Sequence, residues 1–226
     1  MEKIVIQAVL TESSIQELAQ KVDINEMDKQ YKISKYINFP FLDFSDEQQT
    51  YLLKGDIHID GLSVTKQDWS PFNLIIDGNL TVEGTINWNE WGNGSFLYVT
   101  GNLETQNLFL AGCPEAIIKG NLIVEKGLVG SQGDNGGSLI VSGDTKAELI
   151  YCTTYFNMEF PKRPTAFIIA ESDNFIFNSD INEDDFKSVQ NKIKEECQPD
   201  EPGIIDVDEI KDCILAGTSI FKETVS

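Results

Sequence analysis

The chain has 226 residues, of which 41% are hydrophobic and 24% are charged, and this composition excludes a wholly disordered protein. Its 37 acidic residues outnumber 17 basic ones, and the formal net charge of −20 opposes binding to nucleic acid and to anionic lipid. No apolar run approaches the roughly 20 residues that span a bilayer, and the first residues lack the features of a secretory signal. We therefore expect a cytoplasmic protein whose partners are neither nucleic acid nor membranes.

Residues 1–50 are expected to form an N-terminal cap made of a strand and a short helix. Ile4 and Ile6 alternate with other residues, as in a strand with one buried face. Ser14 and Glu17 have the spacing of a capping box, which predicts that a helix begins there.

A repeated Gly-Asp or Gly-Asn pair organises the middle of the chain, residues 51–177. The pair occurs five times, beginning at Gly55, Gly78, Gly101, Gly120 and Gly143. A short apolar run precedes each glycine, apolar residues mostly alternate with polar ones after it, and a third apolar group follows. Three short strands per unit bury their apolar sides only when the units stack, which predicts a mainly β fold, a parallel β-helix of about five to six coils. The handedness preference of parallel connections predicts right-handed winding.

The glycine pairs are expected at the corners of the coils. Glycine suits a corner with positive φ, and stacked Asn side chains can hydrogen-bond from one coil to the next. Residues 166–177 repeat the apolar pattern without the glycine pair, and the sequence leaves open whether they form a further coil.

The pattern of residues 178–226 predicts an acidic C-terminal segment of two helices. The first begins near Asn182, and the second runs from Asp206 to Ala216 with Gly217 as its stop. The inward face of the second helix consists of Val207, Ile210 and Ile214. Helices at the two ends of a solenoid are expected to cover its unpaired strand edges and to oppose end-to-end stacking.

The pattern Gly-Asp/Asn-apolar-x-apolar-x-Gly in Gly55–Gly61 and Gly78–Gly84 resembles the repeats of bactofilins, which are bacterial cytoskeletal proteins. The resemblance covers about residues 50–152, and it implies a right-handed β-helix and a scaffold that assembles with copies of itself. The chain differs from that family in its longer, less regular coils and in its helical flanks.

The fifth position after each glycine is polar in every repeat. Parallel stacking predicts that these side chains form one outward column with about 4.8 Å between rungs. The column contains four carboxylates and one amide, from Asp60, Glu83, Gln106, Glu125 and Glu148. An acidic column of this kind is either a solvated face or a surface that binds a partner.

Catalytic and metal-binding constellations are not evident in the sequence. His58 is the only histidine, and the four cysteines show no CxxC spacing. We therefore predict no catalytic residues, no metal and no cofactor, and a protein that is not an enzyme. The paired carboxylates of the column leave a carbohydrate-active β-helix enzyme as a lesser alternative.

The distribution of charge favours a protein that binds a basic partner. Residues 171–226 carry 15 acidic and five basic side chains. The candidate partner-binding residues outside the column are the acidic Glu183, Asp184, Asp185 and Asp208, with Trp88 and Trp91 as aromatic anchors in an expected loop. Packing of the tryptophans over a coil corner is an equal alternative.

Together these features favour a non-catalytic acidic binding protein. The foremost hypothesis is an immunity protein that neutralises a basic, nuclease-type bacterial toxin, because a strong negative field accelerates association with a cationic surface. The alternative is a bactofilin-like cytoskeletal scaffold that assembles with copies of itself.

Overall fold

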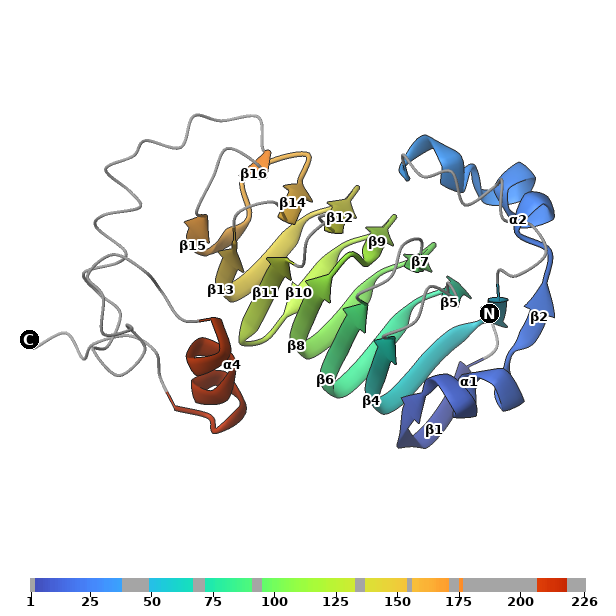
Figure 1. Cartoon of the computed structure of the whole chain (residues 1–226), viewed down its shortest axis with the longest axis horizontal. Coiled ribbons are helices and arrows are strands. Elements are labelled where there is room, and N and C mark those ends of the chain that lie inside the picture. Colours follow the sequence, from blue (N-terminus) through green and yellow to red (C-terminus); the bar gives the residue numbers. More distant parts are fainter. Residues whose placement is uncertain are drawn as a thin grey trace, which may run out of the picture.

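The protein is a β-solenoid of parallel strands, shown in Figure 1 as a computed structural model. The structure describes residues 3–37, 49–66, 72–90, 95–132, 137–153, 156–170, 175–176 and 207–218. The described part is 62% strand, which confirms the mainly β, parallel β-helix prediction, and it has about four turns where five to six coils were predicted.

Two sheets of eight strands each form the walls of the solenoid. Sheet A consists of β1 (Lys3–Thr11), β4 (Asp56–Lys66), β6 (Leu80–Glu90), β8 (Leu103–Gly112), β10 (Leu122–Val124), β11 (Gly127–Gln132), β13 (Thr145–Cys152) and β15 (Thr165–Ala170). Sheet B consists of β2 (Gln20–Val22), β3 (Gln49–Lys54), β5 (Phe72–Asp77), β7 (Phe96–Val99), β9 (Glu115–Ile118), β12 (Gly137–Val141), β14 (Phe156–Glu159) and β16 (Phe175–Ile176). Among these strands, only β2 and β3 pair in antiparallel fashion.

The three predicted strands of each repeat appear as one strand of sheet B and two halves of a bent strand in sheet A. The register shifts between Ile59 and Leu62 in β4 and between Val82 and Thr85 in β6. In a later coil the two halves are separate strands, β10 and β11. The apolar alternation after each glycine therefore continues round a bend before the chain crosses to sheet B.

The glycine pairs lie at the corners between sheet B and sheet A, but close stacking explains them better than positive φ. Of the five glycines of the repeat, only Gly55 has a positive φ, of 103°. A Cβ atom on Gly78 would lie 2.1 Å from the Gly55 carbonyl oxygen, and one on Gly101 would lie 2.4 Å from Asn79 Oδ1. The expectation of positive φ was wrong for four corners, where the coils approach too closely for a side chain.

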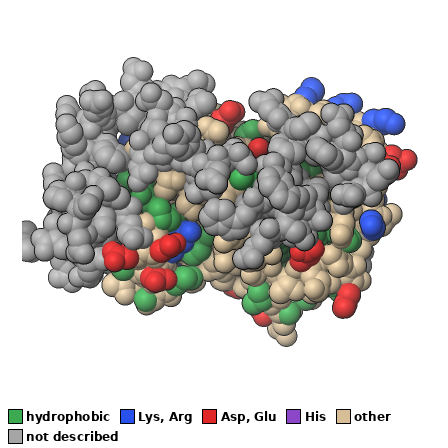
Figure 2. Space-filling view, viewed as in Figure 1, with side chains coloured by type: hydrophobic (Ala, Val, Ile, Leu, Met, Phe, Trp, Pro, Cys, Tyr) green, Lys and Arg blue, Asp and Glu red, His purple; other side chains and the backbone are tan. Residues whose placement is uncertain are grey.

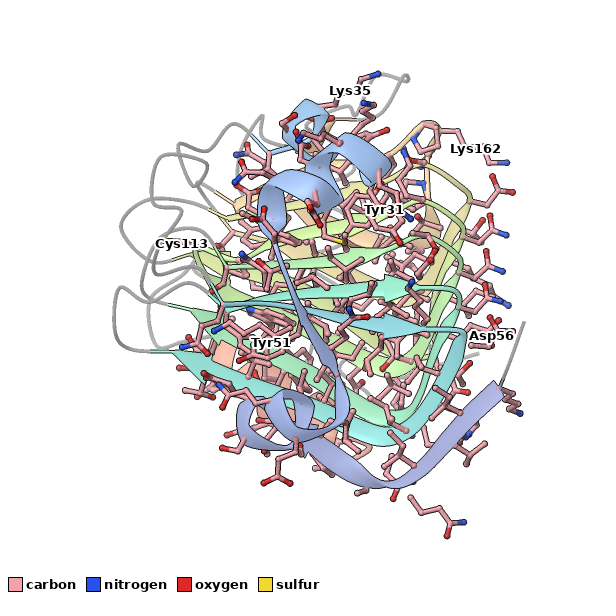
Figure 3. All side chains as sticks on the ribbon, turned by 90° about the vertical axis from the view of Figure 1, so that its right-hand side faces the viewer. Tyr31, Lys35, Tyr51, Asp56, Cys113 and Lys162 are labelled. Carbon is pink, nitrogen blue, oxygen red and sulfur yellow. The ribbon has the colours of Figure 1, made fainter. Side chains whose placement is uncertain are left out.

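The Asp and Asn side chains of the corners form the predicted ladder. Asp56 Oδ1 accepts hydrogen bonds from the backbone N–H (3.0 Å) and from Nδ2 (2.9 Å) of Asn79. The side-chain oxygens of Asn79, Asn102 and Asn121 each accept a 2.8 Å bond from the backbone N–H of the next rung. Figure 3 shows this edge of the solenoid, from Asp56 to the region of Lys162, whose ammonium pairs with Asp144 at 2.7 Å and ends the ladder.

Helix α1 (Glu12–Leu18) lies at the N-terminal end of the solenoid, and its Ile15 is fully buried in the main core. Its N-cap is Thr11, which forms a capping box with Ser14 rather than the predicted box of Ser14 with Glu17. Sequence spacing alone allowed both, and the strand β1 continues to Thr11 and so fixes the start of the helix. Figure 3, viewed from this end, shows the chain between α1 and α2 crossing the end of the solenoid.

The other helices cover outer faces of the sheets rather than the solenoid ends. Ile24 of α2 (Ile24–Tyr31) and Ile33 of the 3-10 helix η1 (Ile33–Lys35) pack on sheet B. The sheet residues beneath them are Leu52, Ile75, Tyr98 and Ile117.

Helix α4 (Val207–Leu215) confirms the second predicted C-terminal helix. Ile210 and Ile214 are buried as expected, and the helix ends at Gly217, whose φ is 68°. The helix packs on the outer face of sheet A against Phe109, Val129, Leu149, Tyr151 and Ile169. The helix predicted to begin near Asn182 lies outside the described residues.

The sequence left open whether residues 166–177 form a further coil, and the structure shows part of one. Strand β15 pairs with β13, and β16 pairs with β14, both in parallel. None of the described helices is long and apolar enough to cross a membrane.

Candidate functional site

The residues of the predicted acidic column face outward on sheet A, at the bend where the register of neighbouring strands shifts. Ile59 pairs with Val82, Val82 with Thr105, and Thr105 with Val124. The residue after each of these is therefore a rung of the column. Leu122 pairs with Thr145 in the same register, which aligns the last rung. The term acidic column is used below for Asp60, Glu83, Gln106, Glu125 and Glu148.

The carboxylates of the acidic column are exposed, and Gln106 is half-buried. Four carboxylates on neighbouring rungs, about 4.8 Å apart, concentrate negative potential along one line. The column itself contains no cation, although Lys146 lies two residues before Glu148 on the same side of β13. A row of exposed carboxylates is complementary to a surface with regularly placed cations.

One carboxylate of the column has a partner that the sequence analysis did not foresee. Glu83 Oε1 lies 2.8 Å from His58 Nε2, and the side chains are 63% and 28% exposed. The two residues are on neighbouring strands, since His58 pairs with Thr81, two residues before Glu83. The register of the glycine repeats was the available signal, because it places position three of one coil near position five of the next.

A second group of acidic side chains lies on α4. Asp208, Glu209 and Asp212 are exposed, and Figure 2 shows acidic side chains gathered where this helix lies. Ile214 of the same helix packs so closely on Gly127 that a Cβ atom there would lie 2.4 Å from its Cδ1. Gly127 is two residues after Glu125, and a Cβ atom on Gly217, just after α4, would lie 3.9 Å from Lys126 Nζ. A cation therefore lies near the C-terminal end of α4, next in the chain to the column residue Glu125.

A groove of about 250 Å³ opens on sheet A beside the glycine corner, and we refer to it as the corner groove. Its walls come from β1, β4, β6 and β8 and from the corner ladder, and they consist of Lys3, Asp56, Ile57, His58, Asn79, Leu80, Thr81, Asn102 and Glu104. The groove adjoins the acidic column, because the imidazole of His58 contacts Glu83. Sequence reasoning missed it, since Lys3 comes from a strand predicted only as part of a cap.

One of the two candidate tryptophan anchors, Trp88, differs from the anchor prediction and is closer to the alternative of packing against the coil. Trp88 lies in β6, and its side chain is fully buried in the core, where its ring is 6.0 Å from that of Phe72. Trp88 is therefore a core residue and not an exposed anchor, because the strand extends further than the sequence indicated and alternation turns this side chain inward. Trp91, Glu183, Asp184 and Asp185 lie outside the described residues.

Metal ligation and thiol chemistry have no assembled site in the part of the chain that the structure describes. It contains no group of three or more His, Cys, Asp or Glu side chains that could hold a metal ion. Cys113 and Cys152 are buried and Cys213, on α4, is half-buried; none of the three forms a disulfide among the described residues.

Four ionisable side chains in the described part of the chain have clearly shifted pKa values. Burial raises the pKa of Glu115, although a hydrogen bond from the Ser138 hydroxyl acts in the opposite direction. Burial also raises the pKa of Tyr98 to about 12 and that of Tyr31 further. Lys211 is a residue of α4, and its ammonium lies 3.3 Å from Ser131 Oγ of sheet A. Burial lowers the pKa of this lysine. Tyr31 and Tyr98 belong to the contact of α2 with sheet B, and Lys211 belongs to α4.

The comparisons with known proteins leave the structure as the source of functional inference. No protein-family model, curated protein or solved structure matches the chain. What the chain itself establishes is a parallel β-solenoid repeat protein with an exposed acidic column and an adjoining groove.

Proposed function

We propose that this chain is a non-catalytic acidic protein that binds and neutralises a basic protein, foremost a nuclease-type bacterial toxin. The observation that carries the proposal is the exposed acidic column, aligned in register on one rigid sheet. A rigid row of carboxylates binds a cationic surface without the entropic cost of ordering a flexible loop. The exposed acids of α4 add to the negative charge of the described surface.

The charge of the whole chain supports the same function. A net charge of −20 raises the association rate with a cationic partner by about 10- to 1,000-fold over a neutral pair at low ionic strength. A toxin that acts on nucleic acid needs a cationic cleft, and a protein that covers this cleft with carboxylates blocks the substrate.

The first test identifies the partner and measures the rate of association. The tagged chain is purified from its native cells at low and high salt, and the bound proteins are identified by mass spectrometry. The proposal expects a stoichiometric basic protein that salt releases and whose toxic activity the chain inhibits. Absence of any basic protein whose activity the chain inhibits would contradict it.

The second test locates the surface. The double variant Glu125→Lys, Glu148→Lys reverses two exposed charges of the acidic column, and the matched control Glu26→Lys, Glu159→Lys reverses two exposed charges on α2 and β14. We expect the column variant to reduce the association rate by more than about tenfold and the control by less than about twofold. Equal reductions would show that net charge alone matters and not the column.

Self-assembly into a bactofilin-like scaffold is a second candidate, favoured by the strand edges at the ends of the solenoid. Among the described strands, β1 at one end and β15 and β16 at the other pair on one side only. The position of α1 over the N-terminal end opposes stacking there. Filaments in electron micrographs would support this candidate, and a monodisperse species over a wide concentration range would overturn it.

A further inference from the structure

We propose that the free edge of β1 pairs with β1 of a second copy of the chain, in antiparallel fashion about a twofold axis at Gln7. The inference does not depend on the proposed function. A twofold pair uses each β1 edge once and is closed, which distinguishes it from the filament of the scaffold candidate. It is carried by the unpaired edge, by two exposed valines and by a strand sequence that matches itself in reverse order.

Strand β1 presents an unpaired backbone edge at the N-terminal end of the solenoid. It pairs with β4 on one side, and no described strand lies on its other side. Figure 3, viewed from this end, shows β1 as the nearest strand of sheet A. Backbone groups of a strand point alternately to its two sides, so about half of those of β1 face the free side. Protein sheets often protect such edges with proline or charge, whereas β1 has no proline and its one charged residue is Lys3, the first.

Two apolar side chains are exposed on the outward face of this edge strand. Val5 and Val9 are each 56% exposed. In the neighbouring strands the row of Val5 continues with the polar residues His58, Thr81 and Glu104. Polar residues would suit an edge that faces water equally well, so the valines favour a contact that covers them.

The sequence of β1 matches itself when it is reversed about Gln7. In this register Val5 lies opposite Val9 of the second copy, Ile4 opposite Leu10, and Ile6 opposite Ala8. Outward side chains therefore meet outward ones, and inward side chains meet inward ones. A shift by two residues would place the valines opposite polar side chains of β1, and a shift by one would set outward positions against inward ones.

The bend of β1 is compatible with this pairing. The register of β1 on β4 shifts between Ile6 and Val9, so the strand has one arm on each side of Gln7. A twofold axis at the bend places the first arm of each copy beside the second arm of the other. The irregularity of the strand therefore coincides with the axis instead of interrupting either paired arm.

The charge at this end does not oppose contact between copies, although the chain as a whole is strongly acidic. Residues 3–22, which comprise β1, α1 and β2, contain two lysines and two glutamates and have no net charge, whereas the chain has −20. The antiparallel register sets Lys3 opposite Thr11 of the second copy, the residue directly before Glu12. Opposite charges thus approach each other at both ends of the paired strands.

The first measurement is the mass of the full-length protein in solution. Sedimentation velocity is recorded over a wide range of protein concentration at low and at high salt. We expect a reversible dimer that becomes tighter as salt rises, because screening reduces the repulsion between two chains of charge −20. A monomer at every concentration, or a series of larger assemblies, would overturn the inference.

Charged variants of the two valines test the register. Val5→Lys or Val9→Glu alone places two unmatched charges in the paired strands, and each is expected to raise the dissociation constant by about tenfold or more. Both changes in one chain set lysine opposite glutamate twice, and this double variant is expected to recover most of the lost affinity. Both positions are exposed, so we expect every variant to fold, which circular dichroism checks.

The matched control is Ile123→Lys, which changes the net charge by the same amount as Val5→Lys. Ile123 is 38% exposed in the same outward row, but it lies on the interior strand β10. We expect its dissociation constant to change by less than about twofold. Equal weakening by both lysine variants, or a double variant no tighter than the single ones, would overturn the pairing of β1.

The outcomes separate this inference from the proposed function. Salt should tighten the dimer, whereas it should release a basic partner. If the chain is a monomer and still neutralises a basic protein, the dimer is wrong and the proposed function stands. If the charge pair restores the dimer but the chain neutralises no basic protein, the dimer stands and the proposed function fails.

Discussion

The outer face of sheet A is polar over the early coils and apolar over the later coils, although the same repeat builds all of them. One outward row, in register from β4 to β15, consists of Ser63, Asn87, Phe109, Val129, Tyr151 and Ile169. Asn87 is exposed and Ser63 is half-buried. The other four side chains are buried, and all of them belong to the cluster under α4. Alternate side chains of a strand point to opposite faces, so the outward row changes from polar to apolar without disturbing the core.

This difference shows that different residues determine the coils of the solenoid and the places where helices pack on its outer faces. The inward residues are apolar at most positions of every coil, with Thr105 and Thr145 as buried polar exceptions, and they hold the two sheets together. The outward residues decide where a helix docks and where the face stays open for a partner. The carboxylates of the acidic column stay exposed beside the part of the face that α4 covers.

The largest expected effect comes from placing a charge in the covered half. In the variant Val129→Asp, a fully buried apolar side chain becomes a carboxylate, which regains full hydration only if α4 leaves the sheet. We expect loss of hydrogen-exchange protection throughout α4 and a loss of stability of about 3 kcal/mol or more. Asn87→Asp in the open half of the same row is the control, with an expected change within about 0.5 kcal/mol. Retained protection of α4 in the Val129 variant would contradict the comparison.

The next effect comes from the helix side of the same contact. Ile210 is fully buried between α4 and sheet A, so Ile210→Ala removes apolar burial and leaves a cavity. We expect docking of α4 to weaken by about 2–4 kcal/mol, measured by hydrogen exchange of its amides. The control Leu215→Ala alters a side chain of the same helix that is 57% exposed, and it is expected to change docking by less than about 0.5 kcal/mol. Similar effects of both variants would show that the helix does not pack as described.

A smaller, sharper test concerns the close contact of Gly127 with α4. A Cβ atom at this position would lie 2.4 Å from Ile214 Cδ1, the flexible end of a side chain. We expect Gly127→Ala to weaken docking by about 1–2 kcal/mol. In the background Ile214→Val, which removes Cδ1, most of this cost is expected to vanish, giving a positive coupling in a double-mutant cycle. Additive effects would place the strain elsewhere.

The smallest expected effect concerns sheet B and the largely buried carboxyl group of Glu115. Burial raises the pKa of Glu115 in the folded protein, so the folded state holds this proton to higher pH than the unfolded state does. Stability should therefore fall as pH rises from the ordinary carboxyl range through the raised pKa, and Glu115→Gln should flatten this fall. Urea unfolding between about pH 4 and pH 8 measures it.

Glu159→Gln is the matched control for this pH experiment. Glu159 is an exposed carboxyl group on β14 of the same sheet, so its replacement removes one negative charge without altering a buried site. If both variants change the pH dependence equally, the effect comes from net charge and not from the burial of Glu115.

The open half was more predictable from the sequence than the covers were. The alignment of the acidic column required only the spacing of the glycine pairs, because parallel strands in register carry equal positions onto one row. The pairing of His58 with Glu83 and the part of Lys3 in the corner groove depended on neighbouring strands and the place of β1 in sheet A. Trp88 was misplaced because the asparagines on either side of it, Asn87 and Asn89, are typical of a loop, whereas β6 continues to Glu90.

The sequence by itself determined the coil, since a period of about 23 residues with fixed apolar positions and glycine corners stacks in only one favourable way. It also determined α4, whose apolar side chains recur at helical spacing before a terminal glycine. The tertiary structure decided which faces the helices cover, because docking depends on side chains from several coils acting together, such as Phe109, Val129 and Tyr151. It also decided why glycine occupies the corners, because the carbonyl oxygens of one coil lie where a Cβ atom of the next would stand.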